Sequence, residues 1–172
     1  SSAASDVYKR QVMGHTSYDW MLLEYAGFCA GLVLVPIYET DSAEQIAWIL
    51  EDADPALVVC ETNAMRELVS SKRDCGRSLK NVLCLEDSAV VRIKKAGVDV
   101  PDFQVDERSR AVTIDDLSTI VYTSGTAGKP KGVEITHGNW MELLANGMKW
   151  MPEIAGYPSS RLLVFLPLAH VL

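Results

Sequence analysis

The stretch AGLVLVPIYETDSAEQIAWILEDADPALVVC, from Ala30 to Cys60, shows a strand, a helix and a second strand in succession. The apolar run Leu32–Val35 is typical of a short buried strand, and Pro36 is expected to stop it. The next segment, Asp41-Ser-Ala-Glu44, resembles a capping box with Asp41 as the helix cap. Apolar residues then recur with the spacing of one helix face, at Ile46, Ile49, Leu50 and Ala53. With Ala56–Cys60 as the next strand, the stretch predicts a strand–helix–strand unit of a parallel sheet.

The same alternation continues on both sides of this unit. A helix over Tyr18–Ala30, capped by Thr16 or Ser17, precedes it, and a helix opened by Thr62 or Asn63 follows it. Further elements are expected as strands at Val82–Leu85, Thr119–Tyr122 and Leu162–Leu166 and as a helix at Thr136–Trp150. Short apolar strands that alternate with helices predict an α/β fold with a mainly parallel sheet.

Three segments do not follow this alternation. Residues 1–11 (SSAASDVYKRQ) show no periodicity, and we expect a disordered or non-native tail there. Residues 86–116 are rich in acidic side chains and poor in periodicity, which favours a solvated connection. The final residues, 161–172, stop within an apolar run. We therefore expect residues 12–172 to be one partial domain of a longer chain, truncated at both ends.

The composition excludes several classes of protein. Apolar residues make up 48% and charged residues 23%, which argues against wholesale disorder. The net charge of −7 is opposite to the basic footprint of a nucleic-acid-binding domain, so no nucleic-acid partner is expected. The longest stretch free of charge and strong polarity is Tyr25–Tyr38. It is interrupted by Gly27, Gly31 and Pro36 and is shorter than the roughly 20 apolar residues that span a membrane.

The cysteines and histidines do not form a metal motif. No two cysteines have CxxC spacing, so a zinc site or a redox pair is disfavoured and buried, reduced thiols are expected. The histidines are too scattered along the chain for a local motif, and we predict no metal ligand. The residues concerned are Cys29, Cys60, Cys75, Cys84, His15, His137 and His170.

The glycine-rich segment that follows the strand Thr119–Tyr122 carries the chemistry. Residues 123–132 (TSGTAGKPKG) combine three hydroxyl side chains, three glycines and two lysines. Glycines allow consecutive amides to turn inward around an anion, while hydroxyls and lysines add donors and positive charge. Residues 118–150 carry a net charge of +1 in a chain of −7. The pattern predicts a phosphate-binding loop.

Two other phosphate-binding motifs are excluded by their spacing. A Walker A loop requires GxxxxGK[ST], but Gly125 and Gly128 are too close together and Pro130 follows Lys129. The GxGxxG pattern of dinucleotide-binding folds is also missing from this segment. A flexible hairpin turn with ordinary surface lysines is the alternative that the residues themselves leave open.

Residues 122–132, YTSGTAGKPKG, resemble the phosphate-binding signature of the adenylate-forming superfamily, which includes acyl-CoA synthetases, luciferases and peptide-synthetase adenylation domains. Residues 30–37 (AGLVLVPI) resemble the AG-x-x-x-VPI motif of that family, and residues 165–170 (FLPLAH) resemble its aromatic-x-P-x-x-H motif. Residues 38–44 (YETDSAE) and the sequence LPLAHV are most similar to bacterial-type long-chain fatty acyl-CoA synthetases. The resemblance covers Met13–Leu172.

The resemblance implies part of the large N-terminal domain of an ATP-dependent acid–thiol ligase. In such enzymes a fatty-acid carboxylate attacks the α-phosphate of Mg-ATP, which gives acyl-AMP and pyrophosphate, and coenzyme A then displaces AMP. The resemblance implies that His170 lies beside the acyl carboxylate and AMP. It also implies that the ATP phosphates are contacted by Thr123, Ser124, Gly125, Thr126, Ala127, Gly128 and Lys131.

Two residues of the loop need separate comment. Ala127 stands where the family usually has a second Thr or Ser, so one hydroxyl donor is missing. Such a donor is worth about 1–2 kcal/mol if it meets a phosphate oxygen. Lys129 occupies a position that varies in the family and is not assigned to the site.

The family's adenine-binding segment, magnesium-binding Glu, ribose-binding Asp and mobile lysine fall downstream of these residues. We therefore expect the isolated chain to be inactive, and the alternative is a non-catalytic nucleotide-binding or truncated regulatory module. The small-molecule partners implied are a fatty acid, ATP and coenzyme A. A cytoplasmic location is expected, with peripheral association with the inner face of the membrane left open. The tryptophans are expected in helix cores or interfaces, with the lining of an acyl site as the alternative: Trp20, Trp48, Trp140 and Trp150.

Overall fold

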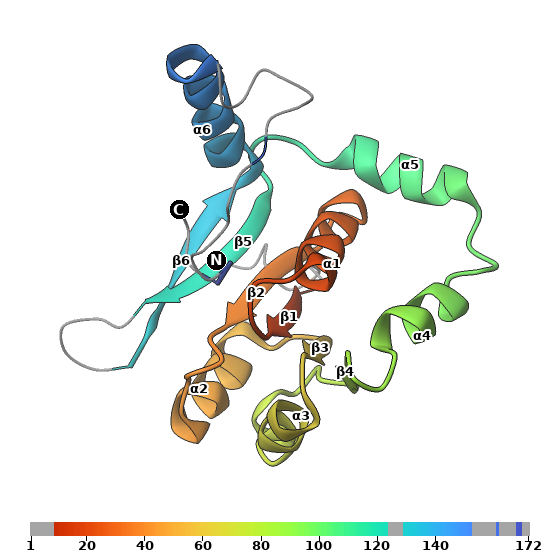
Figure 1. Cartoon of the computed structure of the whole chain (residues 1–172), viewed down its shortest axis with the longest axis vertical. Helices are drawn as coiled ribbons and strands as arrows, with labels where there is room; N and C mark the ends of the chain where they lie inside the picture. The colour runs from red at the N-terminus through yellow and green to blue at the C-terminus, as the bar shows by residue number, and fades with distance from the viewer. Residues whose placement is uncertain (1–8, 124–128, 153–160, 162–167, 170–172) are drawn as a thin grey trace.

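The computed structural model of the chain describes residues 9–123, 129–152, 161 and 168–169. These residues form a sheet with the strand order β4-β3-β1-β2-β5-β6 (Figure 1). The strands are β1 (Lys9–Met13), β2 (Val33–Ile37), β3 (Leu57–Cys60), β4 (Asn81–Cys84), β5 (Leu117–Thr123) and β6 (Lys131–Thr136). Strands β1 to β5 pair in parallel, and β6 pairs antiparallel with β5. The predicted α/β fold with a mainly parallel sheet is confirmed.

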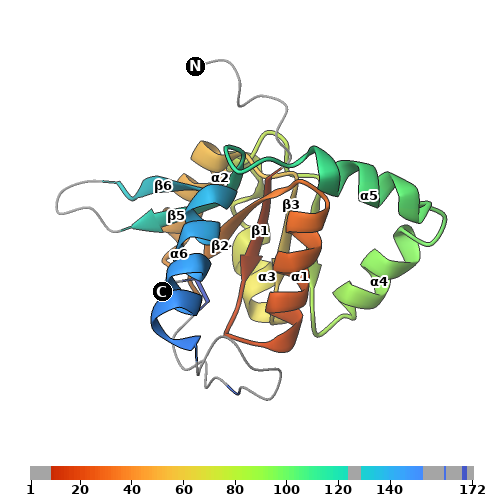
Figure 2. The same ribbon diagram turned by 90° about the horizontal axis from the view of Figure 1, so that it is seen from above.

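Helices cover both faces of this sheet. Figure 2 shows α1 (Tyr18–Cys29) on one face and α2 (Ala43–Ala53) and α3 (Asn63–Ser70) on the other. The helices α4 (Ala89–Ala96) and α5 (Asp102–Ala111) lie on the side of α1. A short 3-10 helix, η2, spans Arg73–Cys75, and α6 (His137–Trp150) follows β6.

Two apolar clusters pack between the helices and the sheet. The larger one joins α2 and α3 to the sheet and contains the predicted stripe of α2, whose four side chains are at most 1% exposed. Burying an isoleucine or leucine side chain contributes about 1.5–3 kcal/mol, so Ile46, Ile49 and Leu50 hold α2 firmly against the sheet. The smaller cluster joins α1 to the sheet through Trp20, Leu23 and Leu34.

The helix starts show where capping was predicted well and where it was wrong. Ser17 caps α1 and Thr62 caps α3, as the sequence allowed. Ser42, not Asp41, caps α2, and its capping box is completed by Gln45 three residues later. The Asp41 carboxylate instead accepts the backbone N–H of Tyr38 at 3.1 Å. The cap therefore lies one residue after the predicted position.

Strand β2 also continues past the residue that was expected to stop it. It runs through Pro36 to Ile37, both paired with β1. On its other side, β2 pairs with β5 only at Leu34 and Thr119 among the described residues. No residue of β5 is paired with Pro36 on that side, so a residue without an N–H can continue the strand there.

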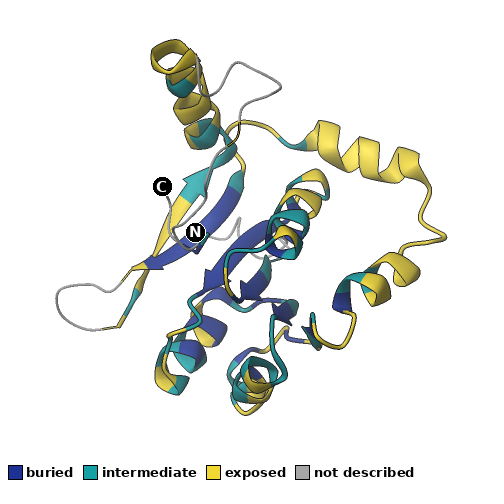
Figure 3. Ribbon diagram, in the orientation of Figure 1, coloured by how far each residue is buried: buried dark blue, intermediate teal, exposed yellow. Residues whose placement is uncertain are grey.

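Three further predictions are corrected by the structure. Residues 9–11 belong to β1, which lies between β3 and β2, so they are not a tail. Residues 86–116 contain α4 and α5, although α5 buries no side chain (Figure 3). The glycine-rich loop is shorter than predicted, because β5 extends to Thr123 and β6 begins at Lys131. Residues 1–8 and the predicted strand Leu162–Leu166 lie outside the described residues. Within the described part, no helix is long and apolar enough to span a bilayer.

Candidate functional site

The carboxyl ends of the parallel strands lie at one edge of the sheet, where open α/β folds bind their ligands. Thr123 is the last residue of β5 at this edge. It pairs with Lys131, the first residue of β6, and both side chains are exposed. The structure thus brings together two of the predicted phosphate-binding residues. Residues 124–128 and His170, also predicted for the site, lie outside the described residues.

The first arm of this hairpin is held by Tyr122. Tyr122 pairs with Gly132 across the strands, and a Cβ atom on Gly132 would lie 2.9 Å from Ile120 Cγ2 and 3.4 Å from Tyr122 Cζ. Only glycine leaves room for this packing. The Tyr122 hydroxyl donates a hydrogen bond to Asp52 Oδ2 of α2 at 2.5 Å. Burial raises the pKa of Tyr122, and the hydrogen bond to Asp52 and the charge of Asp52 raise it further, so the hydroxyl keeps its proton.

The second arm is held by Trp48, also on α2. Its indole Nε1–H donates to the backbone oxygen of Pro130 at 2.8 Å. The ammonium of Lys129 lies 3.8 Å from the centre of the same indole ring, within the range of a cation–π contact. The half-buried Trp48 therefore packs at an interface between a helix and a hairpin, in agreement with its predicted setting.

A pocket of about 450 Å³ opens between the hairpin and the segment that joins β2 to α2. Its lining includes Thr40, Asp41, Thr123 and Pro130. Burial raises the pKa of Asp41, and the nearby Glu39 adds to the rise, while the hydrogen bond from Tyr38 opposes it. The volume falls within the range of small-molecule sites.

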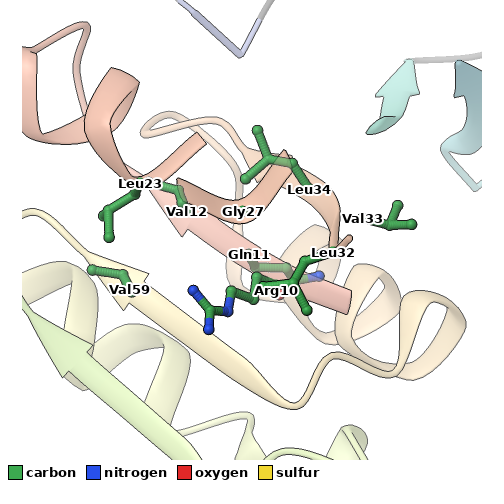
Figure 4. Close-up of a pocket in the computed structure, with 9 residues that line it drawn as sticks. All are labelled: Arg10, Gln11, Val12, Leu23, Gly27, Leu32, Val33, Leu34 and Val59. Carbon is green, nitrogen blue, oxygen red and sulfur yellow. The ribbon is translucent and has the colours of Figure 1, made fainter. Parts of the chain in front are cut away.

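A second cavity cannot serve as a substrate site. It lies between α1 and the sheet beside Gln11 and Gly27 and measures about 10 Å³ (Figure 4). This volume is close to the minimum that one water molecule requires. The pocket beside the hairpin is therefore the better candidate for a ligand.

A titratable pair at the same edge of the sheet escaped the sequence analysis. Glu61 Oε2 accepts both the backbone N–H of His15 and a hydrogen bond with its Nδ1 atom, each at 2.7 Å. The hydrogen bond and charge of Glu61 raise the pKa of His15. Burial alone would raise the pKa of Glu61, but the hydrogen bonds from His15 lower it. The two residues are 46 positions apart, and no local pattern links them.

The cysteines of the described residues do not form a reactive thiol site. Cys60 and Cys84 are buried, as predicted, but Cys29 is exposed at the end of α1, and all four cysteines are free. Burial raises the pKa of the Cys60 thiol to about 12, so it stays protonated at neutral pH. In the described residues, no group of three or more His, Cys, Asp or Glu side chains could hold a metal ion.

Curated proteins similar to this chain are fatty-acid ligases. It is 37% identical over 164 residues to the long-chain-fatty-acid–CoA ligase FadD15 of Mycobacterium bovis, covering 94% of this chain and 27% of that protein. It is 30% identical over 167 residues to long-chain-fatty-acid–CoA ligase 5 of Rattus norvegicus, covering 89% and 24%. The chain thus spans about a quarter of the length of these relatives.

Solved structures agree with the fold. A putative long-chain-fatty-acid CoA ligase from Rhodopseudomonas palustris matches with a TM-score of 0.64 at 19% identity, over 83% of this chain and 35% of that one. A fatty acyl CoA synthetase of Mycobacterium tuberculosis matches with a TM-score of 0.60 at 24% identity, over 76% and 24%. The family model described as AMP-binding enzyme matches residues 11–172. The chain therefore belongs to the AMP-binding enzyme family.

Proposed function

We propose that the protein activates long-chain fatty acids by forming acyl-AMP from ATP and then acyl-CoA. A carboxylate oxygen attacks the α-phosphorus of ATP, and the bond to the departing pyrophosphate breaks. The sulfur of coenzyme A then attacks the acyl carbon, the bond to AMP breaks, and the thiol loses its proton. The residues of this chain serve the first step in this proposal, because the phosphates that leave are bound there.

The observation that carries the proposal is the pairing of Thr123 with Lys131 beside the 450 Å³ pocket. A hydroxyl and an ammonium exposed at the carboxyl edge of a parallel sheet suit the oxygens of a polyphosphate. The named activity of the curated relatives supports the same assignment.

The described residues can assist the reaction without changing their own covalent state. Lys131 would neutralise negative charge that gathers on the leaving pyrophosphate, and Thr123 would donate a hydrogen bond to it. Two anions, a carboxylate and a polyphosphate, must meet in this step, so charge neutralisation and positioning are what the protein has to supply. Each of these contacts acts before pyrophosphate leaves.

Magnesium is implied by the family, but the described residues do not fit a magnesium site. Mg²⁺ prefers several oxygen ligands, but Asp41 is the single carboxylate among the described residues that line the pocket, and its Oδ2 atom already accepts the N–H of Tyr38. No suitable cluster of acidic, histidine or cysteine side chains occurs in this described part. The described residues therefore supply no metal ligand.

The test is fatty-acid-dependent exchange of pyrophosphate into ATP, measured with the protein expressed from its complete open reading frame. We expect exchange with long-chain fatty acids and none with the matching fatty alcohols, which lack the attacking carboxylate. If a folded protein that binds ATP shows no exchange with any chain length, the proposed activity is wrong.

We also propose that residues 1–172 alone do not complete the reaction and that the protein works in the cytoplasm. The short coverage of the ligases supports the first proposal. The cysteine pattern, with Cys60 and Cys84 buried in the core and no CxxC spacing, supports the second proposal. Acyl-CoA formation by the purified 172 residues, or a disulfide in the native protein, would contradict these proposals.

A further inference from the structure

Helix α2 contacts both arms of the hairpin β5–β6 through two side chains one helical turn apart. Trp48 donates to the oxygen of Pro130 at 2.8 Å, and Asp52 accepts from the hydroxyl of Tyr122 at 2.5 Å. Residues four positions apart lie on the same side of a helix, so the two contacts act side by side. Asp52 contacts Tyr122 in β5, and Trp48 contacts Pro130, the residue directly before β6.

The helix that makes these contacts is itself firmly fixed. Ser42 and Gln45 close a capping box at its start, and Asp54 at its end accepts hydrogen bonds from Ser78 at 2.7 and 2.8 Å. Its apolar stripe is buried against the sheet. Because α2 is fixed, Trp48 and Asp52 on its flank can fix the position of the residues that they contact in the hairpin.

The returning strand of the hairpin has strand pairing on one side only. In the described structure, β6 is the last strand of the sheet and pairs only with β5. Four of its six residues, beginning with Lys131, are exposed. The hydrogen bond from Trp48 to Pro130 therefore gives the returning arm a second attachment, in addition to its pairing with β5.

Each contact lies one residue away from a residue assigned to the phosphates. Tyr122 precedes Thr123, and Pro130 precedes Lys131. The indole also faces the ammonium of Lys129 at 3.8 Å, which keeps a second positive charge at the returning arm. The positions of the Thr123 and Lys131 backbones therefore depend directly on Trp48 and Asp52.

We propose that Trp48 and Asp52 are positioning residues for ATP, which hold the paired Thr123 and Lys131 in place relative to α2 and the pocket. This inference rests on the proposed function for the identity of the ligand. Neither residue is expected to touch the substrate. Their loss should weaken ATP binding and slow adenylation, while the later transfer of the acyl group to coenzyme A continues.

The test compares Trp48→Phe, which keeps an aromatic ring for Lys129 but loses the N–H donor, with Tyr122→Phe, which loses the hydroxyl. The matched control is Trp150→Phe on α6, since Trp150 is 73% exposed and has its own lysine, Lys149, at 5.4 Å. A neutral hydrogen bond corresponds to a roughly two- to tenfold effect and one to a charged group to about ten- to a hundredfold. We expect rises of these sizes in the KM for ATP of the two variants and no change in the control.

Three readouts separate positioning from a loss of folded protein. The KM for the fatty acid and the rate of thioester formation from preformed acyl-AMP should stay at the wild-type values. In hydrogen–deuterium exchange without ATP, the peptide covering 129–136 should exchange faster in Trp48→Phe, while the peptide covering α2 should not. Loss of folded protein would instead lower both half-reactions equally and speed exchange in α2.

The outcomes also separate this inference from the proposed function. If the wild type is active and both variants match Trp150→Phe in the KM for ATP, the positioning role is wrong. If the wild type shows no adenylation, the proposed function fails and the role in ATP binding fails with it. Hydrogen exchange then still decides whether Trp48 holds the hairpin, because that readout needs no activity.

Discussion

Replacing Lys131 by alanine should separate catalysis from stability. Lys131 is exposed, makes no ion pair with the described residues, and joins β6 to Thr123 through its backbone, which alanine retains. Exposed substitutions of this kind change the free energy of unfolding by about 0.5 kcal/mol or less. The midpoint of urea unfolding should therefore stay close to that of the wild type.

The effect of Lys131→Ala on adenylation should be much larger. A hydrogen bond between charged groups contributes about 1.5–3 kcal/mol, which corresponds to roughly ten- to a hundredfold in rate. The contact strengthens as pyrophosphate departs, so the loss should appear in the first half-reaction. Thioester formation from preformed acyl-AMP should change little, because pyrophosphate has already left.

The assay compares ATP–pyrophosphate exchange with thioester formation in the same preparations. Lys129→Ala is the matched control, because Lys129 lies over the Trp48 ring and its cation–π contact is worth about 0.5–1 kcal/mol. Its loss should therefore cost only a few-fold in exchange. Equal losses in both half-reactions for Lys131→Ala, together with a lower urea midpoint, would show that the lysine supports the fold and would refute its phosphate role.

Three other substitutions test separate parts of the structure. Gly132→Ala should destabilise the protein by about 1–3 kcal/mol in urea unfolding, because its Cβ would lie 2.9 Å from Ile120 Cγ2; an unchanged midpoint would contradict that packing. Burial raises the pKa of Glu24 to about 7, so the stability that it contributes as a neutral acid is lost as the pH rises from about 4.5 through 7. Glu24→Gln should therefore stabilise the protein by about 1–3 kcal/mol at pH 8, where the lower value allows for the partial exposure of Glu24. If the stability of wild type and variant depends on pH in the same way, this prediction is wrong. Ala127→Thr should tighten ATP by up to about 1–2 kcal/mol in a direct binding titration, and unchanged binding would show that no phosphate oxygen lies within reach of the added hydroxyl.

The fold was predictable where burial imposes a periodic pattern on the sequence. The stripe of α2 is an example, since its four apolar residues pack in one cluster. In α5 no side chain is buried, so no such pattern exists and the segment resembles a solvated connection. In β6, the alternation of Val133, Glu134 and Ile135 was the available signal, but it is too short to predict a strand between the glycine-rich segment and the helix that follows.

Of the candidate site, only the residues of the glycine-rich motif could be predicted from the sequence. Thr123 and Lys131 were assigned to the site because they belong to a local motif, and the structure pairs them. The two residues that hold this pair in place were not found, because their contacts join positions 70 and 82 residues apart. Nothing in the local sequence distinguishes Asp52 from a solvated helix residue, or Trp48 from one that packs in a core.

The two kinds of contact that α2 makes differ in how easily they can be lost. Removing the Ser42 cap would cost about 1 kcal/mol, but each buried isoleucine or leucine of the stripe contributes about 1.5–3 kcal/mol, so the helix stays formed when one contact is lost. At the hairpin, Trp48 and Asp52 each make one hydrogen bond, and β6 has no strand on its outer side in the described structure. A single substitution there can move Thr123 or Lys131 without unfolding α2. The sensitivity of the site and the stability of the fold are therefore set by different faces of the same helix.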